Sequence, residues 1–280
     1  MDQINTDAWV GRAVTDRGGI DEKMAAQITA TLGEVGEVAP RCGELIPGLW
    51  HWCAFPPMAH VSDLGPDGHP RGGALLPPLH LPRRMWAGGS LRFHAPIRVG
   101  DTLTRTTSVR SITPKAGRSG PMTLISLDHA ITGPRGLAVE ERQDIVYLPM
   151  PERFAPPRKQ PMGAPVTRSL PIEETMLFRY SALTFNAHRI HYDADYARNV
   201  EHYPGLVVHG PLQATLLMQA ACDARGRMPE SFAFRSVHPL FVGSDLDIAM
   251  TEQEDGTLTL WTGQSGHQGM QATAIWDGTQ

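Results

Sequence analysis

Alternating hydrophobic and polar positions predict β-strands in two separate stretches of the chain. The first stretch contains the segments TLTRTTSVRSI, MTLISLDHAIT and AVEERQDIVYL (102–112, 122–132 and 138–148), interrupted by turn-like sequences such as TPKAGRSGP. The second contains DLDIAMTEQ, TLTLWTGQ and GMQATAIW (245–253, 257–264 and 269–276), separated by EDG and SGHQ. β-Branched residues with partial alternation are typical of strands. We therefore predict an antiparallel meander in each stretch.

Helical patterns precede each meander. Asp21 can cap the segment EKMAAQITATLG, and its last residue, Gly33, suits a helix end. The segment IEETMLFRYSAL (172–183) places four large residues, Met176, Leu177, Phe178 and Leu183, around one apolar side.

The strongest helical signal is HGPLQATLLMQAACDARG (209–226). Pro211 suits the first turn of a helix, where its missing N–H costs nothing. The run is apolar on most faces, so we predict a buried helix. A helix followed by a curved antiparallel sheet, occurring twice, predicts an α+β fold with a helix wrapped by a sheet in each half.

A proline-rich segment divides the chain. Residues 148–171 contain seven prolines, which fit neither a helix nor a sheet interior. We predict an N-terminal domain at 1–148, an extended linker at 149–171 and a C-terminal domain at 172–280. The two halves contain similar short sequences, PIRVGDTL from Pro96 and PLFVGSDL from Pro239, which suggests that one β-rich unit was duplicated.

Composition narrows the range of partners. The 280 residues are 41% hydrophobic and carry a net charge of −4, so we expect a sizeable core and no basic face for nucleic acid or an anionic membrane. The chain start lacks a secretory signal pattern, and no apolar run reaches about 18 residues, which favours a cytoplasmic protein. Three cysteines without C-x-x-C spacing favour reduced thiols.

The segment LTFNAHRIHYDADYA (183–197) contains two histidines, two aspartates and an asparagine between apolar residues. It suits a catalytic centre, a metal site or the polar end of a helix. His188 and His191 form an H-x-x-H pair with His202 and His209 nearby, but there is no H-E-x-x-H motif and no cysteine support, so we expect no metal. Asp193 is expected to cap the following helix.

Two blocks resemble a known family. FRYSALTFNAHRIHYDADYA (178–197) and YPGLVVHGPLQATLLMQAA (203–221) resemble the hydratase motif of MaoC-like, hotdog-fold enoyl-thioester hydratases and dehydratases. They look closest to the branch of hydroxyacyl-thioester dehydratase type 2 and mesaconyl-CoA or itaconyl-CoA hydratase. LPRRMWAGGSLRFHAPIRVGDTL (81–103) looks like the first hotdog of the same two-domain proteins. The resemblance implies a double hotdog, a homo-oligomer, an acyl-CoA substrate and no separate cofactor.

The resemblance also implies catalytic roles. In the wider family an aspartate and a histidine five residues later form the catalytic pair, and a glycine starts the buried helix. The histidine maps onto His191, a proton carrier, and the glycine maps onto Gly210, whose N–H would stabilise the enolate oxygen. The aspartate position is Asn186, which can orient water but cannot ionise. Asp193 or a substrate carboxylate could supply the missing acid/base function.

Other residues are expected to contact the substrate. These candidates are Val208, His209, His188 and Arg235, the last as a partner for a CoA phosphate. The N-terminal half has no N-x-x-x-x-H block, so we expect it to be non-catalytic and to shape the pocket with Trp50, Trp52 and Phe55.

These observations predict a hydro-lyase. The expected reaction is reversible hydration of a short 2-enoyl-CoA, carboxylated or not, of the itaconyl-CoA or mesaconyl-CoA type. The alternatives are a hotdog thioesterase and a non-catalytic acyl-CoA binding protein. Nucleotide-dependent chemistry is disfavoured, because neither G-x-G-x-x-G after a strand nor a phosphate loop is present.

Overall fold

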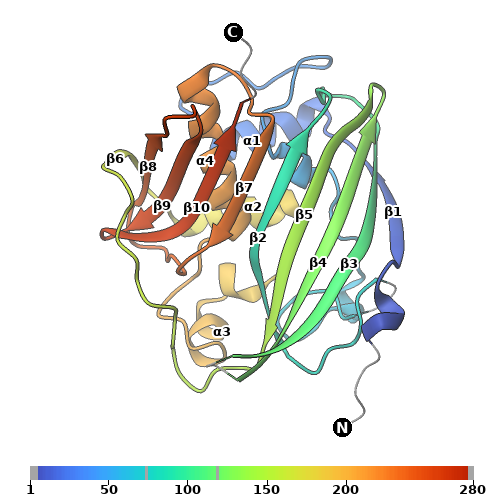
Figure 1. The fold of residues 1–280 in the computed structure, drawn as a ribbon, viewed down its shortest axis with the longest axis vertical. Coiled ribbons are helices and arrows are strands. Elements are labelled where there is room, and N and C mark those ends of the chain that lie inside the picture. The colour runs from blue at the N-terminus through green and yellow to red at the C-terminus, as the bar shows by residue number, and fades with distance from the viewer. Residues whose placement is uncertain (1–5, 73–74, 118–119, 277–280) are drawn as a thin grey trace.

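The strands form one antiparallel sheet that runs through both halves of the chain (Figure 1). The computed structural model describes residues 6–72, 75–117 and 120–276. The strands are β1 (Ala13–Gly18), β2 (Arg83–Phe93), β3 (Leu103–Gly117), β4 (Gly120–Gly133), β5 (Gly136–Leu148), β6 (Val166–Leu170), β7 (Ser231–Ser236), β8 (Leu246–Glu252), β9 (Leu258–Gln264) and β10 (His267–Ile275).

The strand order is symmetric about its centre, as expected if one unit was duplicated. It runs β1-β3-β4-β5-β2-β7-β10-β9-β8-β6, so each strand of the N-terminal half has a counterpart at the mirrored position in the C-terminal half. The two halves join where β2 pairs with β7, from Gly88 opposite Arg235 to Arg92 opposite Ser231. This is the α+β fold that the sequence pattern predicts and the double hotdog that the family resemblance implies.

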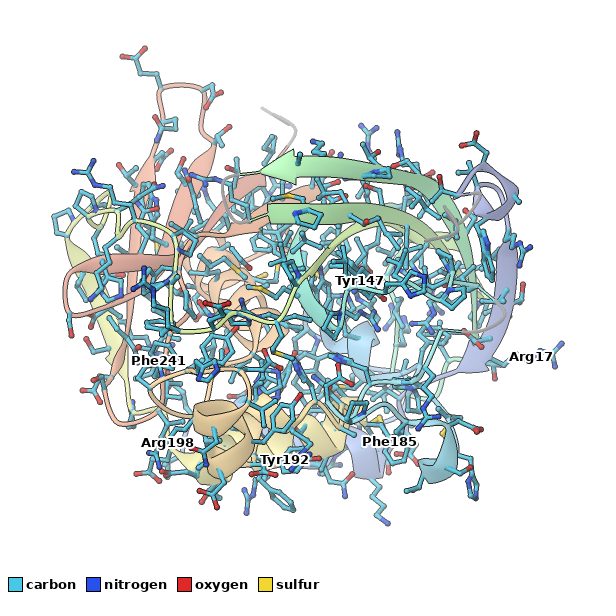
Figure 2. All side chains as sticks on the ribbon, turned by 90° about the horizontal axis from the view of Figure 1, so that it is seen from below. Arg17, Tyr147, Phe185, Tyr192, Arg198 and Phe241 are labelled. Carbon is cyan, nitrogen blue, oxygen red and sulfur yellow. The ribbon has the colours of Figure 1, made fainter. Side chains whose placement is uncertain are left out.

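The helices lie on one side of the sheet. They are α1 (Glu22–Leu32), α2 (Glu174–Thr184), α3 (Ala194–Asn199) and α4 (Gly210–Arg225), with short 3-10 helices η1 (Thr6–Trp9), η2 (Trp50–Cys53), η3 (Val61–Asp63) and η4 (Arg189–His191). Figure 2 shows the helical layer below the sheet, with Tyr147 between the two layers and Arg17 projecting outward at one edge.

Local signals place the helix ends as expected. The Asp21 side chain accepts a hydrogen bond from the backbone N–H of Met24 at the start of α1. Gly226 adopts a left-handed conformation (φ 66°) at the end of α4. Nine of the sixteen residues of α4 are buried, because this helix packs against β7, β9 and β10.

A long buried helix was expected in each half, but in the described residues only the C-terminal half has one, α4. By position α1 is the counterpart of α2: each has eleven residues and follows an edge strand, and the two helices contact each other. Between η3 and β2 no helix occurs in the described residues. The space that a second long helix would fill is therefore left to loops and a cavity.

Several boundaries differ from the sequence predictions. The turn expected at 113–121 begins later, because β3 continues to Gly117 and Pro114 pairs with Thr123. The last residues of the predicted linker form β6, which pairs with β8 at the sheet edge, where proline-rich sequence is tolerated. Phe178, expected on the apolar side of its helix, is 65% exposed. Within the described residues no helix combines the length and the apolarity that crossing a membrane requires.

Candidate active site

A cavity of about 2000 Å³ lies between the halves of the molecule. Its N-terminal wall includes inward-facing residues of β2, β4 and β5, and its C-terminal wall includes the loop after α2 and the start of α4. Among the residues predicted for the site, Asn186, His188, His191, Val208 and Gly210 line this cavity.

The end of α2 sets the position of Asn186. Phe185 adopts a left-handed conformation (φ 52°), and the backbone N–H of Asn186 donates to the carbonyl of Ser181 at 2.8 Å. The Asn186 Oδ1 atom accepts the backbone N–H of His188 at 3.0 Å. Its Nδ2 group has no hydrogen-bond partner in the part of the chain that the structure describes, so it remains a donor toward the cavity.

His191 is buried with one nitrogen fixed. Its Nδ1 atom lies 2.7 Å from the Val207 carbonyl oxygen, which can only accept, so Nδ1 carries the proton. Burial, and then the neighbouring His209 and His188, hold the pKa of His191 well below its usual range. A neutral ring with a protonated Nδ1 leaves the Nε2 lone pair as a proton acceptor.

The start of α4 lies behind this ring. His209 stacks on His191 with 3.6 Å between ring centroids, and its Nε2 atom lies 2.8 Å from Ser181 Oγ. His209 is fully buried, which lowers its pKa to about 3. It does not line the cavity, so its position differs from the substrate contact that the sequence led us to expect.

Gly210 is the first residue of α4, where backbone N–H groups have no partner within the helix. No protein acceptor for its N–H occurs among the described residues. A Cβ atom placed there would come no closer than 3.9 Å to Met270 or Ser236, so protein packing does not demand glycine. The missing side chain leaves room on the cavity side instead.

Asp193 has a structural role. One carboxylate oxygen accepts from the backbone N–H of Tyr196 and caps α3, and the other accepts from Arg189 at 2.7 and 3.0 Å. The backbone N–H of Tyr196, and then Arg189, lower the pKa of this carboxyl group. Asp193 is absent from the cavity lining, so the structure gives no support to it as the missing acid/base group.

Arg235, Trp50, Trp52 and Phe55 have different positions. Arg235 is exposed on β7, donates to Gln271 at 2.6 Å and does not line the cavity. Trp52 and Phe55 line the cavity as expected, whereas Trp50 lies in the core. Beside them, Glu141 accepts hydrogen bonds from the Trp52 Nε1–H group at 3.0 and 3.1 Å and pairs with His51 at 3.3 Å.

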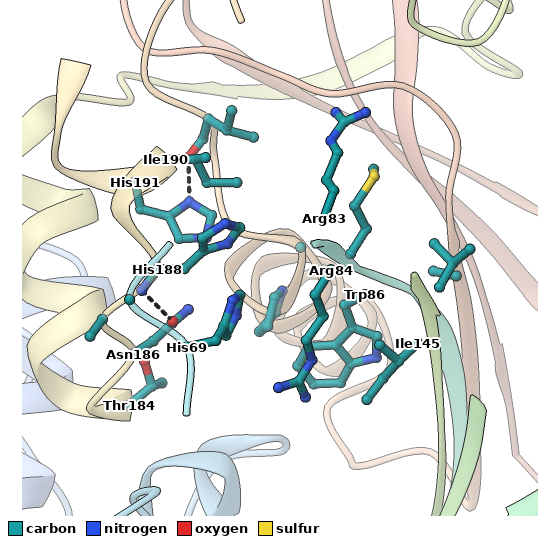
Figure 3. A pocket seen from close by; sticks show the side chains of 18 of the residues that line it. His69, Arg83, Arg84, Trp86, Ile145, Thr184, Asn186, His188, Ile190 and His191 are labelled. Atoms are coloured by element: carbon teal, nitrogen blue, oxygen red, sulfur yellow. Dashed lines mark hydrogen bonds between the residues drawn. The ribbon is translucent and has the colours of Figure 1, made fainter. Parts of the chain in front are cut away.

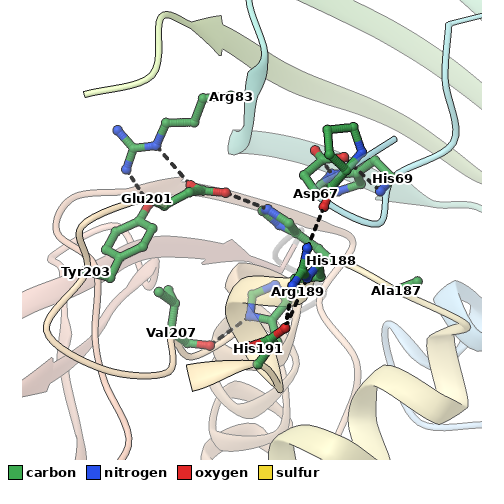
Figure 4. A network of polar contacts seen from close by, with 12 residues as sticks. Asp67, His69, Arg83, Ala187, His188, Arg189, His191, Glu201, Tyr203 and Val207 are labelled. Atoms are coloured by element: carbon green, nitrogen blue, oxygen red, sulfur yellow. Dashed lines mark hydrogen bonds and ion pairs between the residues drawn. The ribbon is translucent and has the colours of Figure 1, made fainter. Parts of the chain in front are cut away.

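A loop of the N-terminal half adds two residues that sequence reasoning missed. His69 Nδ1 lies 2.9 Å from Asp67 Oδ2, and the His69 ring lies 4.1 Å from the His188 ring (Figures 3 and 4). Burial lowers the pKa of His69 to about 3 although Asp67 opposes the shift. Their sequence, PDGHP (66–70), has the composition of an ordinary turn, so only its tertiary position marks it.

This cluster has a composition that can hold a metal ion. One potential ligand atom each from Asp67, His69 and His188 lies within 4.8 Å of the others. We assign no metal to it, and the absence of a metal site stays a prediction from the sequence.

A buried carboxylate connects His188 to the N-terminal half (Figure 4). Glu201 is 2% exposed and pairs with His188 Nε2 and with Arg83 Nε, each at 3.2 Å. Arg83 also donates to the hydroxyl of Tyr203. The network fixes the His188 ring and neutralises Arg83.

The chain is similar in sequence to proteins of known function. The family profile of hydroxyacyl-thioester dehydratase type 2 matches residues 49–242. The chain is 45% identical over 238 residues to mesaconyl-C4-CoA hydratase of Chloroflexus aurantiacus, covering 84% of both chains. It is 32% identical over 247 residues to the mitochondrial hydroxyacyl-thioester dehydratase type 2 of Schizosaccharomyces pombe, covering 78% of this chain and 80% of the relative.

A solved structure shares the fold. The MaoC-like dehydratase of Phytophthora capsici superposes with a TM-score of 0.74 at 15% identity, covering 98% of this chain and 99% of that one.

Proposed function

Because the chain belongs to the hydroxyacyl-thioester dehydratase type 2 family, and is therefore a hydro-lyase of acyl thioesters, we propose that its substrate is a short 2-enoyl-CoA of the mesaconyl-CoA or itaconyl-CoA type. The 45% identity to a mesaconyl-C4-CoA hydratase supports this substrate class. The proposal includes a cytoplasmic homo-oligomer that needs no separate cofactor, since CoA is part of the substrate.

One observation carries the chemical part of the proposal. His191, with Nδ1 held by the Val207 carbonyl, and Gly210, whose N–H at the start of α4 has no acceptor among the described residues, line the same cavity. Hydration requires a proton acceptor for water and a donor for the enolate oxygen. These two residues supply both.

In the proposed reaction, the Asn186 Nδ2 group and His191 Nε2 hold a water molecule over the β-carbon. His191 takes a proton from this water while its oxygen bonds to the β-carbon, and the electron pair of the double bond moves into the thioester enolate. The N–H of Gly210 stabilises the enolate oxygen, helped by the positive end of the α4 dipole. The His191 imidazolium then returns the proton to the α-carbon.

The lowered pKa of His191 keeps its ring neutral for the first step and favours the second step, in which the imidazolium gives up its proton. A ring that burial keeps neutral is ready to accept a proton at pH 7, and its imidazolium is a strong acid toward the enolate. Asn186 cannot ionise, and the Asp193 carboxylate already accepts hydrogen bonds from the start of α3 and from Arg189. We therefore assign the transfer of the water proton to the His191 imidazole.

We propose that the N-terminal domain shapes the acyl pocket. Trp52, Phe55 and Tyr147 supply apolar surface on that side of the cavity. The PDGHP loop also reaches the catalytic turn, because the Arg189 backbone N–H donates to the Asp67 carbonyl at 2.9 Å.

The test is loss of the conjugated enoyl-thioester absorbance with crotonyl-, mesaconyl- and itaconyl-CoA, with mass spectrometry of the products. We expect addition of one water molecule by the native protein and none by His191→Ala. Release of free CoA would indicate a thioesterase instead. Binding without any change in the thioester would indicate a non-catalytic acyl-CoA binding protein.

A further inference from the structure

Two adjacent arginines of β2 have different environments. Arg83 is paired with Glu201 and bonded to Tyr203. The Arg84 side chain has neither a hydrogen bond nor an ion pair with any residue in the described ranges, although Arg84 is half-buried and lines the cavity. A half-buried cation without a counter-ion is unusual, since charges removed from water are ordinarily paired.

Arg84 lines the same cavity as Asn186 and His191. Figure 3 shows its side chain beside Trp86, on the wall across from Asn186 and His191. Its positive charge is close enough to His69 to contribute to the lowered pKa of that histidine, and His69 lies against His188. The Arg84 guanidinium therefore lies in the same cavity as His191, the proposed proton carrier.

Acidic side chains of the cavity lining do not neutralise Arg84. Asp16 pairs with Arg105, Glu141 is held by His51 and Trp52, and Glu201 is held by Arg83 and His188. Glu152 also lines the cavity, but it is exposed and forms no ion pair with Arg84. Among the described residues, no acidic side chain pairs with the Arg84 guanidinium, so an anionic group of a ligand can take that place.

We propose that Arg84 binds a carboxylate carried by the acyl group, so that the preferred substrates are mono-CoA thioesters of short unsaturated dicarboxylic acids. The inference rests on the proposed hydratase function and names the residue that selects its substrate. A guanidinium binds a carboxylate through two parallel N–H···O bonds, and each bond is stronger away from bulk water. Such an ion pair also fixes the acyl chain, which orients the double bond relative to His191.

A CoA phosphate is the other possible anion. The exposed Arg71 and Arg153 also line the cavity and are reachable from solvent, as a phosphate of CoA requires. Arg84 is less exposed and is close to the catalytic histidines. A carboxylate on the acyl group reaches this depth, whereas the phosphates lie at the other end of the pantetheine arm.

The experiment compares kcat/KM for mesaconyl-C4-CoA and crotonyl-CoA, which differ in the carboxylate. In Arg84→Gln we expect kcat/KM for mesaconyl-C4-CoA to fall by about 10–100-fold, the usual effect of removing a hydrogen bond to a charged group, and the crotonyl-CoA value to change by less than about threefold. Arg84→Lys should recover part of the loss. Arg153→Gln is the matched control, and it should affect both substrates by the same factor.

Binding provides a second readout without turnover. Calorimetry with succinyl-CoA and butyryl-CoA, which have no double bond to hydrate, should show that Arg84→Gln weakens only succinyl-CoA. Equal losses for both substrates or both ligands would assign Arg84 to a phosphate or to folding and would overturn the proposal. A native protein that hydrates crotonyl-CoA but not mesaconyl-C4-CoA would overturn it while leaving the hydratase function intact. A native protein that hydrates neither would overturn the function itself.

Discussion

Gly68 of the N-terminal half lies directly against the carbonyl group of Ala187, in the turn that carries Asn186 and His188. Gly68 adopts a left-handed conformation (φ +90°), and a Cβ atom there would overlap the Ala187 carbonyl. Next to this contact, Arg189 donates to the carbonyl groups of Asp67 and Pro66. The close approach of the two backbones joins the halves at the catalytic turn.

Gly68→Ala is therefore expected to displace this turn. We expect a loss of more than about 1 kcal/mol in the free energy of unfolding, because alanine disfavours positive φ and must push the Ala187 carbonyl away. We also expect a lower kcat, measured with the preferred enoyl-CoA. Gly205→Ala is the control, since a Cβ atom there meets nothing within 4 Å. Equal stabilities of the two variants in urea unfolding would contradict this role for Gly68.

His191→Gln is expected to lower kcat by about 10²–10⁴-fold with little change in KM, the range for removal of a general acid/base group. His60→Gln is the matched control, because His60 lies in an exposed loop, bonds to Ser62 and does not line the cavity. Circular dichroism should show that both variants are folded. If kcat of His191→Gln stayed within a few-fold of the native value, another group must carry the proton, and His69 would be the next to test.

Asn186 is expected to matter through both ends of its amide. Asn186→Ala removes the acceptor for the His188 N–H and the donor toward water, so we expect kcat to fall at least about tenfold and stability to fall by about 1 kcal/mol. Asn186→Asp keeps the acceptor and should preserve stability, but it exchanges the amide N–H donor for a carboxylate that can act as a base, so it should change turnover and its pH dependence without abolishing activity. Steady-state kinetics and thermal unfolding of both variants test the proposal. Unchanged turnover in both would remove Asn186 from the mechanism.

Buried histidines should make folding sensitive to mild acid. The pKa of His209 is about 3 in the folded protein and about 6.5 in the unfolded chain, so only the unfolded chain binds the proton between these values. Stability is therefore complete above pH 6.5 and falls as pH drops toward 3, by about 1.4 kcal/mol per pH unit for each such histidine. Urea unfolding at pH 7 and pH 5 should show a smaller difference for His209→Gln than for the native protein. The exposed His60→Gln should keep the native difference, and loss of the difference in both variants would contradict the assignment to His209.

Glu201→Gln should destabilise the junction between the halves. It leaves Arg83, whose side chain is 15% exposed, without its carboxylate, and removing one partner of a buried ion pair costs about 3–5 kcal/mol. Glu34→Gln, in the exposed pair with Arg168, should cost less than about 1 kcal/mol. Chemical denaturation of both variants provides the comparison. Similar losses in the two would show that Glu201 is not an effectively buried charge.

The sequence alone determined the features that depend on neighbouring residues. Capping by Asp21 and Asp193, the buried helix from Gly210 and the meander strands all follow from patterns within a few residues. The site residues Asn186, His191 and Gly210 came from a motif whose spacing the resemblance supplied. The central strands β2 and β7 were missed, because RRMWAGGSLRF and SFAFRS show no extended run of β-branched alternation.

Tertiary structure decided what the two halves contribute to one another. The sequence pattern did not indicate that the PDGHP loop would contact the catalytic turn or that Glu201 would pair with Arg83. Nor did it indicate that the Arg84 side chain would find no partner among the described residues. These relationships connect residues more than 100 positions apart, and the strand pairing that joins the halves fixes them. Local propensity cannot encode such contacts, because they form only when folding buries these residues and brings the two halves together around the cavity.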